Sequence, residues 1–188
     1  MGKGIKPKFF TISGPSGVGK TTVFNEICES SLFKSGQLEA PVKISTRTSR
    51  LSDNVAEIKS VSLTDYKKLS AKEKMIEFNR HDYHYSVLFP KSMEEKIFFQ
   101  VVPAEYAIIA KKKYKLEIDF YIIMLMAPSS LINSRRSSRC DNLSNDEVIS
   151  RQETFEIESK VNYDYLVDAS MPIADVVDNV LSIINDKR

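Results

Sequence analysis

The sequence has little cysteine and no apolar run long enough to cross a bilayer. Its two cysteines, Cys28 and Cys140, lie far apart and lack metal-ligand spacing, which argues against a disulfide framework or a zinc site. The longest apolar run covers residues 120–127, and residues 1–8 are too polar for a secretory signal. These absences predict a cytoplasmic protein with no membrane partner.

The chain also lacks a strong excess of either charge. Its 27 basic residues against 25 acidic residues leave a net charge of +2, which argues against nucleic acid as a partner. A hydrophobic content of 42% and a charged content of 28% are ordinary for a globular chain, and 188 residues suit one compact domain. The oligomeric state stays open between monomer and homodimer.

The most informative segment covers residues 8–25, KFFTISGPSGVGKTTVFN. Residues 9–12 form a β-prone apolar run, residues 14–19 form a glycine-rich turn, and the following residues favour a helix. The turn fits the phosphate-loop pattern GxxxxGK[ST] completely. A glycine and serine turn that matches by chance is the alternative, but the expected strand before it and helix after it favour a nucleoside triphosphate site.

The spacing of the loop has a physical cause. Three glycines let the backbone fold tightly and remove the Cβ atoms that would keep amide groups away from phosphate oxygens. The helix that follows directs its positive end at the same anion. We expect Lys20 to bind the β- and γ-phosphates and Thr21 to ligate Mg²⁺. The expected ATP-binding residues are Gly14, Pro15, Ser16, Gly17, Val18, Gly19, Lys20, Thr21 and Thr22.

Strands and helices alternate along the chain. Strands are predicted at 40–44, 75–78, 97–102, 117–126 and 165–167, and residues 29–40 are predicted to be a polar connection. Helices are predicted at 21–28, 64–69, 90–96, 103–113, 128–136, 145–159 and 172–185. This order predicts an α/β fold of three layers, with a mainly parallel core sheet between helices.

Two groups of arginines lie outside the phosphate loop. Arg47 and Arg50 follow a predicted strand among small hydroxyl residues, where they could grip a phosphate or simply be loop charges. Four more lie in a hydrophilic segment that could be either a mobile cover or a solvated helical hairpin: Arg135, Arg136, Arg139 and Arg151.

Residues 77–86 form a candidate acceptor patch through Glu77 and Tyr85. The two histidines at positions 81 and 84 raise the alternative of a metal site. That alternative ranks low, because no cysteine or third histidine is available and Asp82 is the only nearby carboxylate.

Taken together, these segments resemble the guanylate kinase family over essentially the whole chain. The matching segments are GPSGVGKTT, STRTSR, MIEF, YHYS, MAPSS and YLVDAS. The resemblance implies a P-loop NTPase fold with a core (1–42, 91–129 and 156–188), a small acceptor-binding insertion (43–90) and a helical lid (130–155). It also implies ATP with Mg²⁺ as donor and a small phosphorylated acceptor, first GMP. The implied catalytic residues are Lys20, Arg47, Arg135, Arg139 and Arg151, and the implied acceptor-binding residues are Ser45, Arg47, Arg50, Glu77 and Tyr85.

The sequence departs from that family on the acceptor side. Lys43 stands where the family has a guanine-contacting serine, and Gln100 and Val102 stand where it usually has two aspartates. Ribose 1,5-bisphosphate phosphokinase is a similar family that also lacks the aspartate pair, and it offers an alternative acceptor. A second alternative is a kinase-like binding module, although such modules usually have a damaged phosphate loop. A nucleotide-driven switch would need an Asp-ended strand and a water-positioning residue, and the sequence offers no convincing candidate for either.

Overall fold

The computed structural model describes residues 5–49, 54, 56–69, 73–80, 82–90, 92–93, 95–138 and 161–188. The larger of its two sheets has five parallel strands in the order β2-β7-β1-β8-β9. These strands are β1 (Lys8–Ser13), β2 (Leu38–Glu39), β7 (Ile97–Val101), β8 (Asp119–Met126) and β9 (Tyr165–Asp168). The sheet confirms the predicted parallel core, and the carboxyl ends of its strands share one edge.

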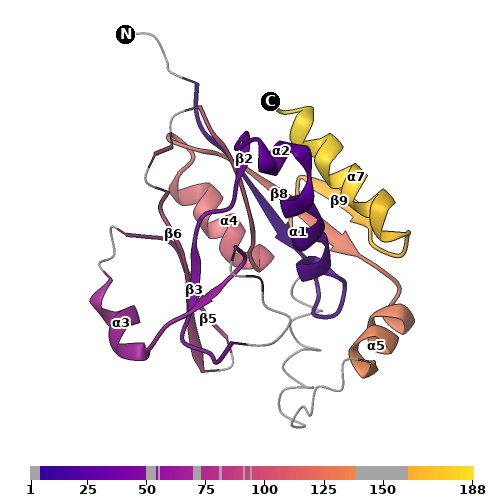
Figure 1. Ribbon diagram of the computed structural model, residues 1–188, viewed down its shortest axis with the longest axis horizontal. Coiled ribbons are helices and arrows are strands. Elements are labelled where there is room, and N and C mark those ends of the chain that lie inside the picture. The colour runs from indigo at the N-terminus through magenta and orange to yellow at the C-terminus, as the bar shows by residue number, and fades with distance from the viewer. Residues whose placement is uncertain are drawn as a thin grey trace.

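Helices cover both faces of this sheet (Figure 1). Outside the smaller sheet described below, the helices are α1 (Lys20–Glu29), α2 (Ser31–Lys34), α4 (Ala104–Lys113), α5 (Ser129–Ser137) and α7 (Ile173–Asn185). Helices α1 and α7 pack in one apolar cluster, and α4 packs in the other cluster on the opposite face. Together with the sheet they form the three predicted α/β/α layers.

Strand β1 lies at the centre of the sheet because both of its faces are apolar. Phe9 and Phe10 are each fully buried, and they contribute to opposite clusters. The Phe9 ring packs 5.0 Å from the ring of Phe120, whereas Phe10 packs in the cluster of α1 and α7. Each buried phenylalanine contributes about 2–3 kcal/mol through the hydrophobic effect. This burial holds the loop that follows β1 on a rigid strand.

The smaller sheet is built from residues 43–88. Its strand order is β4-β3-β6-β5, with β3 and β4 parallel and the other pairs antiparallel. Its elements are β3 (Lys43–Ser45), β4 (Lys59–Ser60), α3 (Leu63–Lys68), β5 (Lys74–Arg80) and β6 (Tyr83–Leu88). One face of this sheet packs in the same apolar cluster as α4. The smaller sheet is thereby anchored to the core.

Several local predictions differ from the structure. The connection predicted at 29–40 contains α2 and the edge strand β2, because Leu38 is fully buried beside β7. The helix predicted at 90–96 is wrong for the described residues 92, 93, 95 and 96, where Glu95 has a left-handed φ of 52°. The helix predicted at 64–69 begins and ends one residue earlier, because the hydroxyl of Ser62 accepts from the amide of Asp65 and caps α3.

The helix predicted at 145–159 lies outside the described residues. Within the part of the chain that the structure describes, no helix is long and apolar enough to span a bilayer.

Candidate nucleotide-binding site

The loop between β1 and α1 has the conformation that its glycines predict. Gly14, Gly17 and Gly19 have φ angles of 138°, 87° and 112°, a region that residues with a Cβ rarely adopt. A Cβ atom at Gly14 would lie only 2.4 Å from the carbonyl oxygen of Leu125 on β8. The loop therefore turns tightly against the neighbouring strand at the carboxyl edge of the sheet.

The first turn of α1 is suited to an anion. Among the described residues, no side chain caps this end of the helix, and its first turn contains no acidic residue. The amide groups of the turn and the positive end of the helix dipole consequently point at the space enclosed by the loop. Thr21 and Thr22 lie in this turn, where the sequence predicted them.

The Lys20 ammonium group bends back over the loop. Its Nζ donates hydrogen bonds to the carbonyl oxygens of Gly14, at 2.5 Å, and Pro15, at 2.9 Å. These contacts hold a full positive charge beside the same amide groups. A polyphosphate in the loop would meet Lys20 together with the helix terminus.

Two arginines of α5 donate hydrogen bonds to the loop. Arg136 Nε donates to the carbonyl oxygen of Ser16 at 2.8 Å, and Arg135 Nη1 donates to the carbonyl oxygens of Val18 at 2.9 Å and Ala169 at 3.1 Å. A Cβ atom at Gly17 would lie 2.8 Å from Cγ of Arg136. The glycine therefore also makes room for α5.

A cavity of about 350 Å³ opens beside the loop. Its walls come from the loop, from α1, from α5 and from the segment between β9 and α7, and they include Gly19, Thr22, Arg135, Ala169 and Met171. A volume in this range is typical of a site for a small molecule. The cavity adjoins the phosphate loop on the side of β9.

The predicted phosphate-gripping turn follows β3. Ser45 is fully buried, and its Oγ accepts a hydrogen bond from the amide of Arg47 at 3.1 Å. Arg47 is half-buried, and its Nη1 donates to the carbonyl oxygen of Thr48 at 2.9 Å. Arg50, Arg139 and Arg151 lie outside the described residues.

Glu77 lies in a polar cluster under α3. Its Oε1 accepts hydrogen bonds from the Tyr66 hydroxyl at 2.8 Å and from Lys74 Nζ at 2.9 Å. Partial burial raises the pKa of Glu77, but the hydrogen bonds from Lys74 and Tyr66 outweigh that effect, and the net pKa is lowered. Burial is also the largest influence on Tyr66, whose pKa is raised to about 12. At neutral pH the cluster therefore pairs a neutral phenol with an ionised carboxylate.

Tyr85 faces away from Glu77. Across the β5–β6 hairpin, Glu77 pairs with Ser86 whereas Phe78 pairs with Tyr85, and successive side chains point to opposite faces. The rings of Phe78 and Tyr85 stack with centroids 5.0 Å apart, and Phe78 also stacks on Tyr106 of α4. The structure therefore does not bring the two predicted acceptor residues together.

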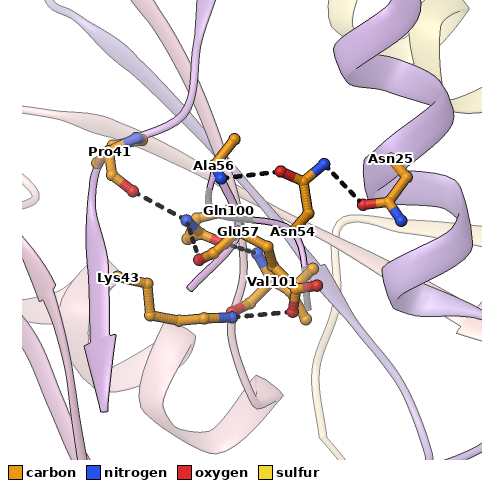
Figure 2. Close-up of polar contacts among 8 residues, drawn as sticks. All are labelled: Asn25, Pro41, Lys43, Asn54, Ala56, Glu57, Gln100 and Val101. Carbon is orange, nitrogen blue, oxygen red and sulfur yellow. Dashed lines mark hydrogen bonds and ion pairs between the residues drawn. The ribbon is translucent and has the colours of Figure 1, made fainter. Parts of the chain in front are cut away.

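The carboxyl end of β7 carries a buried polar network (Figure 2). The fully buried Gln100 donates from Nε2 to the carbonyl oxygens of Pro41, at 2.8 Å, and Glu57, at 3.1 Å, and its Oε1 accepts from the amide of Val101 at 2.8 Å. Lys43 Nζ donates to Glu57 Oε1 at 3.2 Å and to the carbonyl oxygen of Val101 at 3.0 Å. Gln100 is thus a structural residue here.

Mg²⁺ prefers oxygen ligands, and it usually keeps several waters while binding only one or two protein groups. Among the described residues, no three histidine, cysteine or acidic side chains gather as a metal cage. The Thr21 hydroxyl lies at the start of α1, and Glu57 Oε2 is buried without a hydrogen-bond partner among the described residues. A hydroxyl oxygen and a carboxylate oxygen are both of the ligand type that suits a hydrated Mg²⁺.

Comparison with known proteins identifies the fold. The structure is similar to a guanylate kinase from Anaplasma phagocytophilum, with a TM-score of 0.72 and 17% sequence identity over 98% of this chain and 87% of that one. The chain therefore has the α/β fold of that guanylate kinase. A gluconokinase from Sinorhizobium meliloti 1021 matches with a TM-score of 0.49 and 14% identity, over 96% of this chain and 93% of its own. A sugar kinase from a Janibacter species matches with a TM-score of 0.47 and 13% identity, over 94% and 93%.

At the level of sequence alone, no protein-family model and no curated protein matches this chain.

Sequence reasoning missed several residues of the site. Tyr66 binds Glu77 and Ser86 from a helix that carries no recognisable motif. The contact between Lys43 and Glu57 joins residues 14 positions apart across a segment without regular periodicity. Arg136 appeared only as one of several charges in a hydrophilic segment. A search for charged residues beside buried runs could have flagged Lys43 and Glu57, although not their pairing.

Proposed function

We propose that this protein transfers a phosphoryl group from ATP to a small phosphorylated acceptor. The observation that carries this proposal is the phosphate loop itself, with three left-handed glycines, Lys20 folded over it and an uncapped helix behind it. The adjoining 350 Å³ cavity supplies a place for the adenosine part of the donor. The fold shared with a guanylate kinase supports the same conclusion.

The proposed division of labour follows the segments of the chain. Residues 1–42, 91–129 and 156–188 form the donor-binding core, residues 43–90 bind the acceptor, and residues 130–155 form the lid. Lys20 and Thr21 act on the donor, the latter as the protein ligand of Mg²⁺. Arg47 and Arg50 hold the acceptor phosphate, and Arg135, Arg139 and Arg151 offset charge from the lid.

An acceptor phosphate is already ionised at neutral pH, so the reaction needs no strong general base. Catalysis then depends on alignment of the two phosphates and on positive charge around the transferred group. The bound Mg²⁺ supplies further positive charge. In this structure Arg135 and Arg136 bind loop carbonyl oxygens. We propose that Arg135 exchanges such a contact for a phosphate oxygen when substrates bind.

GMP is the first candidate acceptor. Glu77 is the reason, because an ionised carboxylate can accept from both the N1 hydrogen and the N2 amino group of guanine. Its side chain is 52% exposed, so a ligand can reach it despite its contacts with Tyr66 and Lys74. The lowered pKa of Glu77 keeps it ionised at neutral pH.

A sugar phosphate such as ribose 1,5-bisphosphate is the second candidate. The observation that favours it is the buried Lys43, whose ammonium is committed to Glu57 and Val101 where a serine would contact guanine in the resembling family. In addition, Lys74 already binds Glu77 Oε1 at 2.9 Å, which leaves the carboxylate less free for a base.

One assay separates these acceptors. ADP release from ATP and Mg²⁺ is measured with GMP, dGMP, the other nucleoside monophosphates and ribose 1,5-bisphosphate. We expect acceptor-dependent ADP release with one of them, and we expect Lys20→Ala to lower turnover by orders of magnitude while the protein stays folded. ADP release that no acceptor stimulates would contradict the proposal and would favour a binding module.

A further inference from the structure

The carboxylate of Glu57 is buried near the carboxyl end of β7, and only one of its two oxygens has a hydrogen-bond partner among the described residues. The side chain is only 9% exposed, and its Oε1 lies 3.2 Å from Nζ of Lys43, whose side chain is 5% exposed. Its other oxygen, Oε2, is buried and has no hydrogen-bond partner within the described part of the chain. In Figure 2 the carboxylate lies next to Val101, where the ammonium of Lys43 reaches it.

A buried carboxylate oxygen without a partner is costly. Leaving such a group unsatisfied costs about 1–3 kcal/mol, and more when the group is charged. Native structures rarely contain one unless an ion, a water or a functional role explains it. Lys43 balances the net charge of Glu57, but its contact satisfies only Oε1. Oε2 is therefore suited to a donor that binds together with a ligand.

The carboxylate lies where the phosphate loop begins. Lys43 Nζ joins it to the carbonyl oxygen of Val101, which pairs with Ile12 on the adjacent strand β1. One residue further along, Ser13 Oγ donates to the carbonyl oxygen of Val102 at 2.7 Å. Gly14, the first residue of the loop, follows directly. The carboxylate and the loop therefore share one edge of the sheet.

A second tether joins the Glu57 segment to α1. Asn54 Nδ2 donates to Asn25 Oδ1 at 3.0 Å, and Asn54 Oδ1 accepts from the amide of Ala56 at 2.9 Å. Asn25 follows Thr21 by four residues, so the two side chains lie on the same face of the helix. The segment that positions Glu57 is thus bound to the helix face that carries the expected Mg²⁺ ligand.

Strand β7 contains no aspartate or glutamate that could serve the cation. Gln100 uses its amide to hold Pro41, Glu57 and Val101, and Val102 is a fully buried apolar residue. We propose that Glu57 supplies the missing carboxylate, and that its Oε2 accepts a hydrogen bond from a water bound to the divalent cation that the Thr21 hydroxyl ligates. Glu57 is then a positioning residue, because it acts through that water. This inference rests on the proposed function.

The rival explanation is that Glu57 serves only to neutralise Lys43. The double variant Lys43→Met and Glu57→Gln separates the two, because it replaces the buried ion pair with a neutral pair of similar size. Such replacements are often tolerated, whereas removing one partner leaves an unpaired buried charge. The unfolding midpoint in urea shows that the variant is folded. If the double variant does not fold, the single variant Glu57→Asp replaces it in the test. This variant keeps the negative charge and shortens the side chain by one methylene, which withdraws the carboxylate.

The measurement uses Mn²⁺ as the probe. Binding of Mn²⁺ to the protein with saturating ADP is followed by the electron paramagnetic resonance signal of free Mn²⁺, and ADP affinity without metal is measured alongside. We expect the double variant to bind Mn²⁺ about 10- to 100-fold more weakly, with unchanged metal-free ADP affinity. The matched control is Glu39→Gln. Glu39 lies on edge strand β2 and its carboxylate pairs with Lys96, so its removal should leave Mn²⁺ affinity unchanged.

Two results would contradict different parts of the account. A folded double variant that binds Mn²⁺ like the unaltered protein would overturn the role of Glu57 and leave the proposed function intact. Failure of the unaltered protein to bind ADP, or to bind Mn²⁺ more tightly than ADP alone does, would overturn the proposed donor site and the Glu57 role with it.

Discussion

The amide of Gln100 donates a hydrogen bond of 2.8 Å to the carbonyl oxygen of Pro41, and the same amide group also binds the carbonyl oxygen of Glu57. A carboxylate at this position would face two acceptors without a hydrogen to donate. The departure from the aspartate of the resembling family is therefore built into the packing of this sheet edge, and reversing it by a single substitution should fail.

The variant Gln100→Asp tests whether the packing of this sheet edge requires the amide of Gln100. The substitution leaves two buried carbonyl oxygens without donors and adds a buried charge, so we expect it to lower the free energy of unfolding by about 3 kcal/mol or more. It should not raise the rate of phosphoryl transfer. Urea denaturation measures the first effect, and the ADP-release assay measures the second. A stable, more active Gln100→Asp protein would show that Gln100 has no structural role.

Gly14→Ala tests the geometry of the phosphate loop. The added Cβ would lie 2.4 Å from the carbonyl oxygen of Leu125, and φ is 138°. We expect the free energy of unfolding to fall by about 3 kcal/mol or more. The matched control is Gly36→Ala, where φ is 74° but no atom of the described residues lies within 4 Å of the new Cβ, so strain alone should cost about 1–2 kcal/mol. Equal losses in urea denaturation would contradict the close approach of loop and strand.

Tyr66→Phe tests the cluster under α3. The substitution removes the hydroxyl that contacts Glu77 Oε1 and the buried Ser86 Oγ, at 2.7 Å. We expect a loss of about 1–3 kcal/mol of stability, since Ser86 is left without this partner. The control is Tyr83→Phe on β6, the strand that also carries Ser86. Tyr83 is 43% exposed, so this substitution should change stability by less than about 0.5 kcal/mol. A neutral effect of Tyr66→Phe would mean that its contacts do not form in solution.

The ionisation of Glu77 makes a prediction about pH. Because the folded-state pKa is lowered, Glu77 stabilises the fold above its unfolded pKa, and this contribution is lost as the pH falls through the folded pKa. Nuclear magnetic resonance titration of the carboxyl group should show a pKa below its usual range. Lys74→Met should raise that pKa, because burial then acts against a weaker set of opposing contacts. An unchanged pKa in Lys74→Met would contradict the ion pair at 2.9 Å.

The sequence was sufficient for those parts of the structure that local rules determine. The alternation of strands and helices predicted the parallel core, and the glycine spacing predicted a tight loop between β1 and α1. Edge strand β2 was missed because its two residues carry no periodic pattern, and its position depends on burial of Leu38 beside β7. The helix predicted at 90–96 does not form in the described residues of that range, where Glu95 has a left-handed φ of 52°.

In the candidate site, too, the features set by neighbouring residues could be predicted, and those set by contacts between distant segments could not. The loop residues are adjacent in sequence, so their conformation follows from their own glycines. The contacts of Tyr66 with Ser86, and of Lys43 with Glu57, join segments that meet only after the smaller sheet has packed. Likewise, Glu77 and Tyr85 were grouped by proximity in the chain, but the alternation of side chains along the hairpin separates them onto opposite faces.

The most direct test of the central claim is the affinity of the protein for a fluorescent ATP analogue with Mg²⁺. The unaltered protein and Lys34→Ala, which lacks an exposed lysine of α2 that is paired with Glu29, should bind equally. Lys20→Ala should bind about 10- to 100-fold more weakly, because it loses a charge-assisted contact with phosphate. If Lys20→Ala binds the analogue as tightly as the unaltered protein, the loop is not the nucleotide site and the account is wrong.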